Sequence, residues 1–111
     1  MWNNPETITT TLDSMKETSL ELKSFYVYKY CAPTRGSFLS GRYPYKLCAT
    51  RNNLNPAQVP EGINLGYTYI TEKLATASQG YVSYQIGKWH QGYYKPDYTP
   101  VGRGFNYSYG F

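Results

Sequence analysis

Cysteine and histidine are scarce in this chain. Its 111 residues include two cysteines and a single histidine. Cys31 and Cys48 permit one disulfide bond but form no disulfide framework, so cysteine usage does not define the cellular compartment.

Long apolar runs are also lacking. No stretch approaches the roughly 18 to 20 apolar residues that cross a bilayer, so no membrane span is predicted. The first five residues, MWNNP, have neither a basic start nor an apolar run, and no signal peptide is recognised.

Charge is mildly basic, with eleven Lys and Arg against seven Asp and Glu and a formal net charge of +4. This balance favours anionic ligands. The basic residues form no stripe, which argues against nucleic-acid binding. Fourteen tyrosines are the main compositional outlier. Tyrosine combines apolar area with a hydroxyl, so it suits a core, a sheet or a sugar-facing surface.

The first third of the chain predicts a helix, a strand and a second helix. Threonines at 9–11 cap a short helix that ends near residues 17–19. Aromatic and β-branched residues over 22–30 predict a buried strand. Pro33 suits the first turn of a following helix, and Gly41 is a natural stop for it.

Further along the chain, Asn, Pro and Gly predict a loop over 49–66. A helix is expected over about 67–78, with Ile70 and Leu74 spaced for burial and Gly80 ending it. Residues 81–90 read as another strand, and the remainder is loop-like. Strands alternating with helices predict an α/β layer with a parallel sheet, in which ligands gather beyond the carboxyl ends of the strands.

Two short segments carry residues suited to chemistry. If a helix begins near Ala32, Arg35 lies on the same face as Cys31, and the free N–H groups of the helix start favour an anion. Lys88 and His90 would project from one face of a strand. For each pair taken alone an ordinary structural role stays open: a buried cysteine with a surface arginine, and solvated polar residues at a strand end.

Taken together, these segments resemble the two signatures of the sulfatase family. CAPTRGSFLSGR resembles the first, in which Cys-x-Pro-Ser/Thr-Arg precedes Leu-Thr/Ser-Gly, and GYVSYQIGKWHQG resembles the second, which ends in Gly-Lys-Trp-His-x-Gly. PVGRGFNYSYGF resembles the loop that follows. The departures exchange one hydroxyl residue for another at Thr34, Ser40 and Ser83. The likeness is greatest to the arylsulfatase B-like animal enzymes, which implies an alkaline phosphatase-like α/β fold, incomplete in this chain.

The resemblance implies that a formylglycine-generating enzyme oxidises Cys31 to formylglycine, because Cys31, Pro33 and Arg35 supply the Cys-x-Pro-x-Arg pattern that this enzyme reads. The hydrated aldehyde would attack the sulfur of a sulfate ester, either an aryl sulfate or a sulfated sugar. By the same resemblance Arg35 steadies the hydrate, Lys88 binds a sulfate oxygen and His90 hydrogen-bonds the formylglycine hydroxyl.

The family also uses one divalent cation, usually Ca²⁺, bound by formylglycine, an upstream Asp-Asp pair and a downstream Asp-Asn pair. Asp13 and Asp97 are the only aspartates here, and neither lies in such a motif. Residues 1–111 are therefore expected to be a partial catalytic domain, a fragment or truncated product that is inactive alone. Asn106 opens an Asn-Tyr-Ser glycosylation sequon, consistent with a lysosomal or secreted protein. The alternative is a non-catalytic protein or a sulfated-sugar-binding module.

Overall fold

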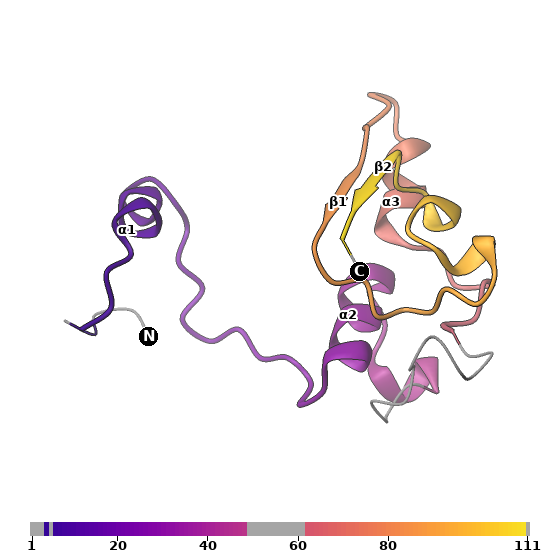
Figure 1. Cartoon of the computed structure of the whole chain (residues 1–111), viewed down its shortest axis with the longest axis horizontal. Coiled ribbons are helices and arrows are strands. Elements are labelled where there is room, and N and C mark those ends of the chain that lie inside the picture. The colour runs from indigo at the N-terminus through magenta and orange to yellow at the C-terminus, as the bar shows by residue number, and fades with distance from the viewer. Residues whose placement is uncertain (1–3, 5, 49–61, 111) are drawn as a thin grey trace.

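A short N-terminal helix stands apart from the rest of the molecule. The computed structural model describes residues 4, 6–48 and 62–110, so most of the loop predicted over 49–66 lies outside the described residues. Helix α1 (Thr10–Glu17) confirms the predicted helix and buries none of its residues. The Thr9 hydroxyl donates to the Asp13 carboxylate at 3.1 Å instead of capping a backbone N–H. Figure 1 shows α1 and the segment after it extending away from the other elements.

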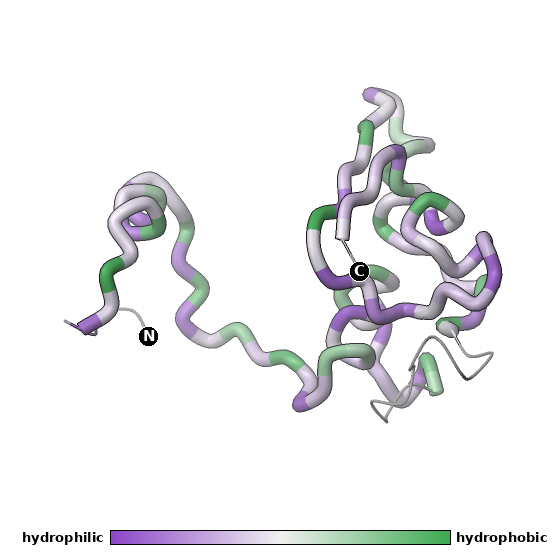
Figure 2. Tube along the Cα trace, in the orientation of Figure 1, coloured by the Kyte–Doolittle hydropathy of each residue, from purple (hydrophilic) through white to green (hydrophobic). Residues whose placement is uncertain are grey.

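The predicted strand over 22–30 is wrong. This segment is an extended connection without strand structure, and Tyr26 at its centre is 89% exposed. Figure 2 shows hydrophobic and hydrophilic residues interspersed along this segment. A strand needs a neighbour for its backbone N–H and C=O groups, and no strand pairs with this segment within the described ranges. Strand-forming residues alone do not supply that neighbour.

Helix α2 (Cys31–Ser40) begins and ends where the sequence predicts. Pro33 lies in its first turn, where the missing N–H is tolerated. Gly41 ends the helix in the left-handed region, with φ of 66°, and its N–H donates to the Ser37 carbonyl at 2.8 Å. The buried face carries Ala32, Pro33, Gly36 and Leu39. The 3₁₀ helix η1 (Pro44–Leu47) follows and adds Leu47 to the core.

Helix α3 (Ile70–Ala75) is shorter than predicted, and a different face of it is buried. Ile70 is 45% exposed, whereas Tyr69 and Thr71 are buried. The Glu72 carboxylate accepts the Tyr69 N–H at 2.6 Å, which fixes the start of the helix. The helix stops at Ala75 rather than at Gly80. In the described part of the chain, no helix is long and apolar enough to cross a membrane.

The sheet is a parallel pair. Strand β1 (Tyr84–Ile86) pairs with β2 (Tyr107–Tyr109), with Tyr84 opposite Tyr107 and Ile86 opposite Tyr109. The strand predicted over 81–90 is thus confirmed only at its centre, and β2 falls in a stretch predicted to be loop. Between the strands lie two 3₁₀ helices, η2 (Pro96–Tyr98) and η3 (Val101–Arg103). The parallel pairing agrees with the expected α/β class.

Trp89 links the sheet to the helices at the centre of the core. The buried apolar residues are Ala32, Leu39, Leu47, Ile63, Tyr69 and Trp89. The indole packs edge to face against Tyr69 and Phe105, with ring centroids 6.2 and 5.8 Å away. Its N–H donates to the carbonyls of Gly92 at 3.0 Å and Tyr98 at 2.8 Å. Trp89 therefore anchors the backbone that follows it, at Gly92 and at Tyr98.

A buried arginine supports this core from the other side. Arg103 is 2% exposed, and its guanidinium lies 3.9 Å from the centroid of the Tyr69 ring. It donates to the Tyr67 carbonyl and forms an ion pair with Glu72 at 3.7 Å. Burial is the main cause that raises the pKa of Tyr69 to about 12, although the charge of Arg103 opposes the rise. The Arg103 carbonyl in turn accepts the Thr71 hydroxyl at 2.6 Å.

Removal of this guanidinium should destabilise the fold. Arg103→Ala leaves the Tyr67 carbonyl and part of the Glu72 charge without a partner, and we expect a loss of about 3 kcal/mol in the free energy of unfolding. Arg42→Ala is the matched control: Arg42 is exposed and lies over the Tyr67 ring, so its loss should cost less than about 1 kcal/mol. Urea titration followed by circular dichroism measures both. Equal effects would contradict the role given to Arg103.

Candidate functional site

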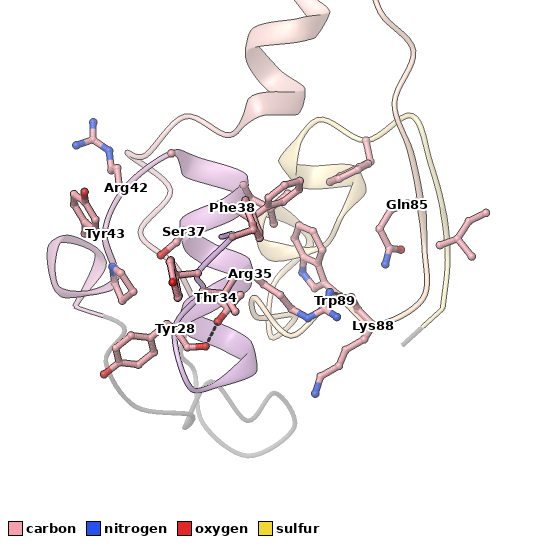
Figure 3. A pocket seen from close by; sticks show the side chains of 18 of the residues that line it. Tyr28, Thr34, Arg35, Ser37, Phe38, Arg42, Tyr43, Gln85, Lys88 and Trp89 are labelled. Carbon is pink, nitrogen blue, oxygen red and sulfur yellow. Dashed lines mark hydrogen bonds between the residues drawn. The ribbon is translucent and has the colours of Figure 1, made fainter. Parts of the chain in front are cut away.

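The two sequence segments singled out for chemistry meet in the structure. The Arg35 guanidinium, on the second turn of α2, donates through Nη1 to the Lys88 carbonyl at 2.6 Å. Figure 3 shows Arg35 reaching from α2 toward the backbone at Lys88 and Trp89. This bond joins residues 53 positions apart in the sequence. It leaves the remaining N–H groups of the guanidinium available to an anion.

A second bridge lies beside the first. The Gln91 amide donates through Nε2 to the Ala32 carbonyl at 2.9 Å and to the His90 carbonyl at 2.6 Å. Ala32 directly follows Cys31, so this amide connects the first turn of α2 to the segment that carries His90. Gln91 itself is 1% exposed.

His90 lies in the irregular segment after β1 rather than on a strand. Its φ of 57° is in the left-handed region, which histidine adopts more readily than most residues. The predicted reason for placing Lys88 and His90 on one strand face is therefore wrong, because β1 ends at Ile86. Burial lowers the pKa of His90 below its usual 6.5, and the positive charges of Lys88 and Arg35 lower it further. Lys88 and Arg35 thus favour the neutral form of the His90 imidazole.

Cys31 is the first residue of α2 and is exposed. The partial positive charge of a helix N-terminus favours an anion there. Cys48 is also exposed and unpaired, and it ends η1 with a φ of 54°. The structure therefore contains no disulfide between the two cysteines.

Thr34 ties the incoming chain to the same helix. Its hydroxyl donates to the Tyr28 carbonyl at 2.7 Å, and its N–H donates to the Tyr30 carbonyl at 3.1 Å. Figure 3 shows the first of these bonds beside Arg35. The hydroxyl at this position of the motif therefore orients the backbone immediately before Cys31.

A cavity of about 820 Å³ lies between residues 25–28, α2 and β1. Most of its lining is apolar, including Phe38, Ile86 and Trp89, and Arg35 and Lys88 also border it. Cys31 and His90 are not among its lining residues. The polar site at the start of α2 is therefore distinct from this apolar space. Arg35 and Lys88 belong to the site and also line the cavity.

The described residues do not themselves provide a cation site. No group of three or more His, Cys, Asp or Glu side chains lies together among them. Asp13 lies on the distant α1, where its carboxylate accepts the Thr9 hydroxyl. Asp97 lies exposed in η2. These residues do not fit the carboxylate cage that Ca²⁺ prefers.

The sequon at Asn106 lies at the entrance to β2. The Asn106 side-chain carbonyl accepts the Ser83 N–H at 2.8 Å, and the Ser108 hydroxyl donates to Gln85 at 2.7 Å. Asn106 is exposed. Both ends of the sequon thus contact the connection leading into β1 or β1 itself.

Sequence reasoning missed two residues of this region. Gln91 occupies the position that the second signature leaves open, so the motif gave no reason to select it. Arg103 lies in the segment that resembles the following loop, but a single arginine between glycines does not indicate a buried cation. Its position after a turn-forming Pro-Val-Gly is the only signal that the sequence offers.

Comparison with known proteins assigns the family. A model of the Sulfatase family matches residues 3–111. Mouse (Mus musculus) arylsulfatase J is 31% identical over 109 residues, human (Homo sapiens) N-acetylgalactosamine-6-sulfatase 32% over 117, and rat (Rattus norvegicus) arylsulfatase G 36% over 103. These alignments cover 98, 99 and 92% of this chain. The chain belongs to the sulfatase family.

The chain spans only about a fifth of these relatives, namely 18, 22 and 19% of their lengths. Among solved structures too, this chain matches a small part of a longer protein. The crystal structure of Ps i-CgsB superposes with a TM-score of 0.64 at 33% identity and covers 73% of this chain and 17% of that one. The structure of the same protein in complex with k-i-k-neocarrahexaose gives a TM-score of 0.64 at 32% identity. The expected α/β class of part of a sulfatase domain is confirmed.

The electrostatics of His90 can be tested directly. With its pKa below 6.5, His90 is neutral at pH 7, and Lys88→Met should raise that pKa by removing a nearby cation. Because the fold favours the neutral imidazole, folding stability is retained above pH 6.5 and declines as the pH falls below it. NMR titration of the imidazole, the only one in the chain, measures the shift. Lys29→Met is the control, and an equal shift in both variants would contradict the assignment.

Proposed function

We propose that this chain carries part of the active site of a sulfuric ester hydrolase of the arylsulfatase type, with Cys31 as the residue converted to formylglycine. The observation that carries the proposal is the hydrogen bond between Arg35 and the Lys88 carbonyl. It brings the two sulfatase signatures together at the start of α2, although they are separated by more than 50 positions.

The structure supports the roles proposed for Cys31, Arg35 and Lys88. Exposure at the first position of α2 gives Cys31 access both to a modifying enzyme and to a substrate. When formed, the hydrated formylglycine supplies the attacking oxygen. Arg35 keeps N–H groups free to hold charge beside residue 31, and the Lys88 ammonium binds a sulfate oxygen as a point charge.

Neutral His90 is suited to a hydrogen bond with the hydroxyl of residue 31. Its depressed pKa leaves one ring nitrogen able to accept and the other able to donate. Nδ1 is buried and has no hydrogen-bond partner, so the exposed side of the ring is the one that would face substrate. Each such preorganised donor typically contributes roughly 2.7–4 kcal/mol to transition-state stabilisation.

The remaining parts of the proposal rest on family membership. They are one divalent cation (Ca²⁺ by resemblance), a formylglycine-generating enzyme as partner, a secretory or lysosomal location and glycosylation at Asn106. The described residues form no cluster of side chains that could hold the cation. A sulfated sugar is favoured as substrate by the names of the human relative and of the neocarrahexaose complex. Residues 1–111, a partial catalytic domain in this proposal, should not hydrolyse an aryl sulfate alone.

Turnover in a complete enzyme tests the proposal. The host is mouse arylsulfatase J with its matching segment replaced by residues 3–111 of this chain, produced with a formylglycine-generating enzyme. Lys88→Ala should lower aryl sulfate turnover about 10²–10³-fold, the scale of a lost oxyanion donor. Cys48→Ser is the control, since Cys48 is an exposed, unpaired cysteine at the end of η1.

The reverse ranking of these two variants would show that the chemistry has been misassigned. A host that binds sulfated sugar but has no turnover would favour the alternative, a non-catalytic sugar-binding module.

A further inference from the structure

Gln91 has an unusual environment for a polar side chain. It is 1% exposed, and its single amide nitrogen donates to two carbonyls, those of Ala32 and His90. Its Oε1 atom is buried without a hydrogen-bond partner. Buried amides normally satisfy all their polar atoms, so this geometry indicates that the two donated bonds determine where the side chain lies.

The two carbonyls connect Gln91 to the proposed reacting groups. One belongs to Ala32, which follows Cys31 in the first turn of α2, and the other belongs to His90 itself. His90 has a φ of 57°, a conformation that is uncommon outside glycine, and its carbonyl accepts the Gln91 amide. The Gln91 carbonyl also accepts the Ile63 N–H at 3.4 Å, which connects this segment to the core.

The space around the amide is fitted to it on the α2 side. A Cβ added to Gly36 would lie 3.0 Å from Gln91 Oε1 and 3.3 Å from Leu47 Cδ1. Only glycine at this position therefore lets the amide approach the helix without displacement. The approach in turn brings Nε2 to 2.9 Å from the Ala32 carbonyl.

We propose that Gln91 is a positioning residue, which sets the placement of His90 relative to residue 31 by hydrogen-bonding to the backbone of both segments. This inference rests on the proposed sulfate ester hydrolysis. Gln91 does not touch substrate in this role. It acts through the first turn of α2 and the segment that carries His90. A misplacement of about 1 Å is enough to lower turnover on the order of 10²-fold.

The test compares Gln91→Met with Gln79→Met in the sulfatase host. Methionine fills a similar volume but cannot donate to the two carbonyls, whereas Gln79 is exposed and only accepts the Tyr81 hydroxyl. We expect Gln91→Met to lower kcat about 10–100-fold with KM within about twofold of the parent. Gln79→Met should match the parent in both. A residue that merely supports the fold would lower the melting temperature without this split between kcat and KM.

Hydrogen exchange measured by mass spectrometry gives a readout that does not require activity. Amides of residues 31–36 should exchange faster in Gln91→Met than in the parent, while those of β1 and β2 stay unchanged. If the parent host lacks turnover, the proposed function fails, and the exchange data still decide whether Gln91 holds the two segments together.

Gly36→Ala is the second variant in case Gln91→Met does not fold. It keeps both amide donors and displaces the side chain by pressing on Oε1, so kcat should fall several-fold with little change in KM. Parent-like kcat in both folded variants, or unchanged exchange over residues 31–36, would overturn the inference.

Discussion

The described structure depends on the contact between the first turns of α2 and the segment that follows β1. Two hydrogen bonds form it, from Arg35 to the Lys88 carbonyl and from Gln91 to the Ala32 carbonyl. They join residues 53 and 59 positions apart. Closing such long loops costs conformational entropy, which local propensity cannot offset. Burial of the aromatic core must therefore supply the stabilisation.

Trp89 connects that core to the contact. It lies between Lys88 and His90, and its ring packs on Tyr69 and Phe105 while its N–H holds the Gly92 and Tyr98 carbonyls. Lys88 and His90 therefore flank a buried neighbour that is anchored in the core. Arg103 completes the arrangement from behind Tyr69. Within this signature, the apolar Trp89 anchors the segment in the core, and its polar neighbours Lys88 and His90 face the site.

Much of the local structure could be predicted because it depends on single residues. Pro33 and Gly41 define the limits of α2 through their own backbone preferences. The strand over 22–30 could not be judged this way, since a strand requires a partner that the segment itself does not reveal. β2 was missed for the opposite reason: its Tyr-Ser-Tyr sequence is short and lies among turn residues, yet it pairs with β1.

The site was predictable only to the extent that motifs specify it. The resemblance selected Cys31, Arg35, Lys88 and His90, and the structure brings the Arg35 guanidinium to the backbone carbonyl of Lys88. The resemblance could not select Gln91, because the role proposed for this residue depends on its burial between two carbonyls. Nor could strand periodicity account for His90, because its left-handed backbone interrupts the alternation of side chains.

In the proposed function, Cys31, the exposed residue at the start of α2, is the residue that reacts. The most direct measurement is the chemical state of Cys31 after production of the chain in the secretory pathway with a formylglycine-generating enzyme. A hydrazide probe should label the wild-type chain and leave Cys31→Ala unlabelled, with mass analysis placing the aldehyde on the peptide that contains residue 31. Equal labelling of both chains, or an unmodified thiol at Cys31, would contradict the account.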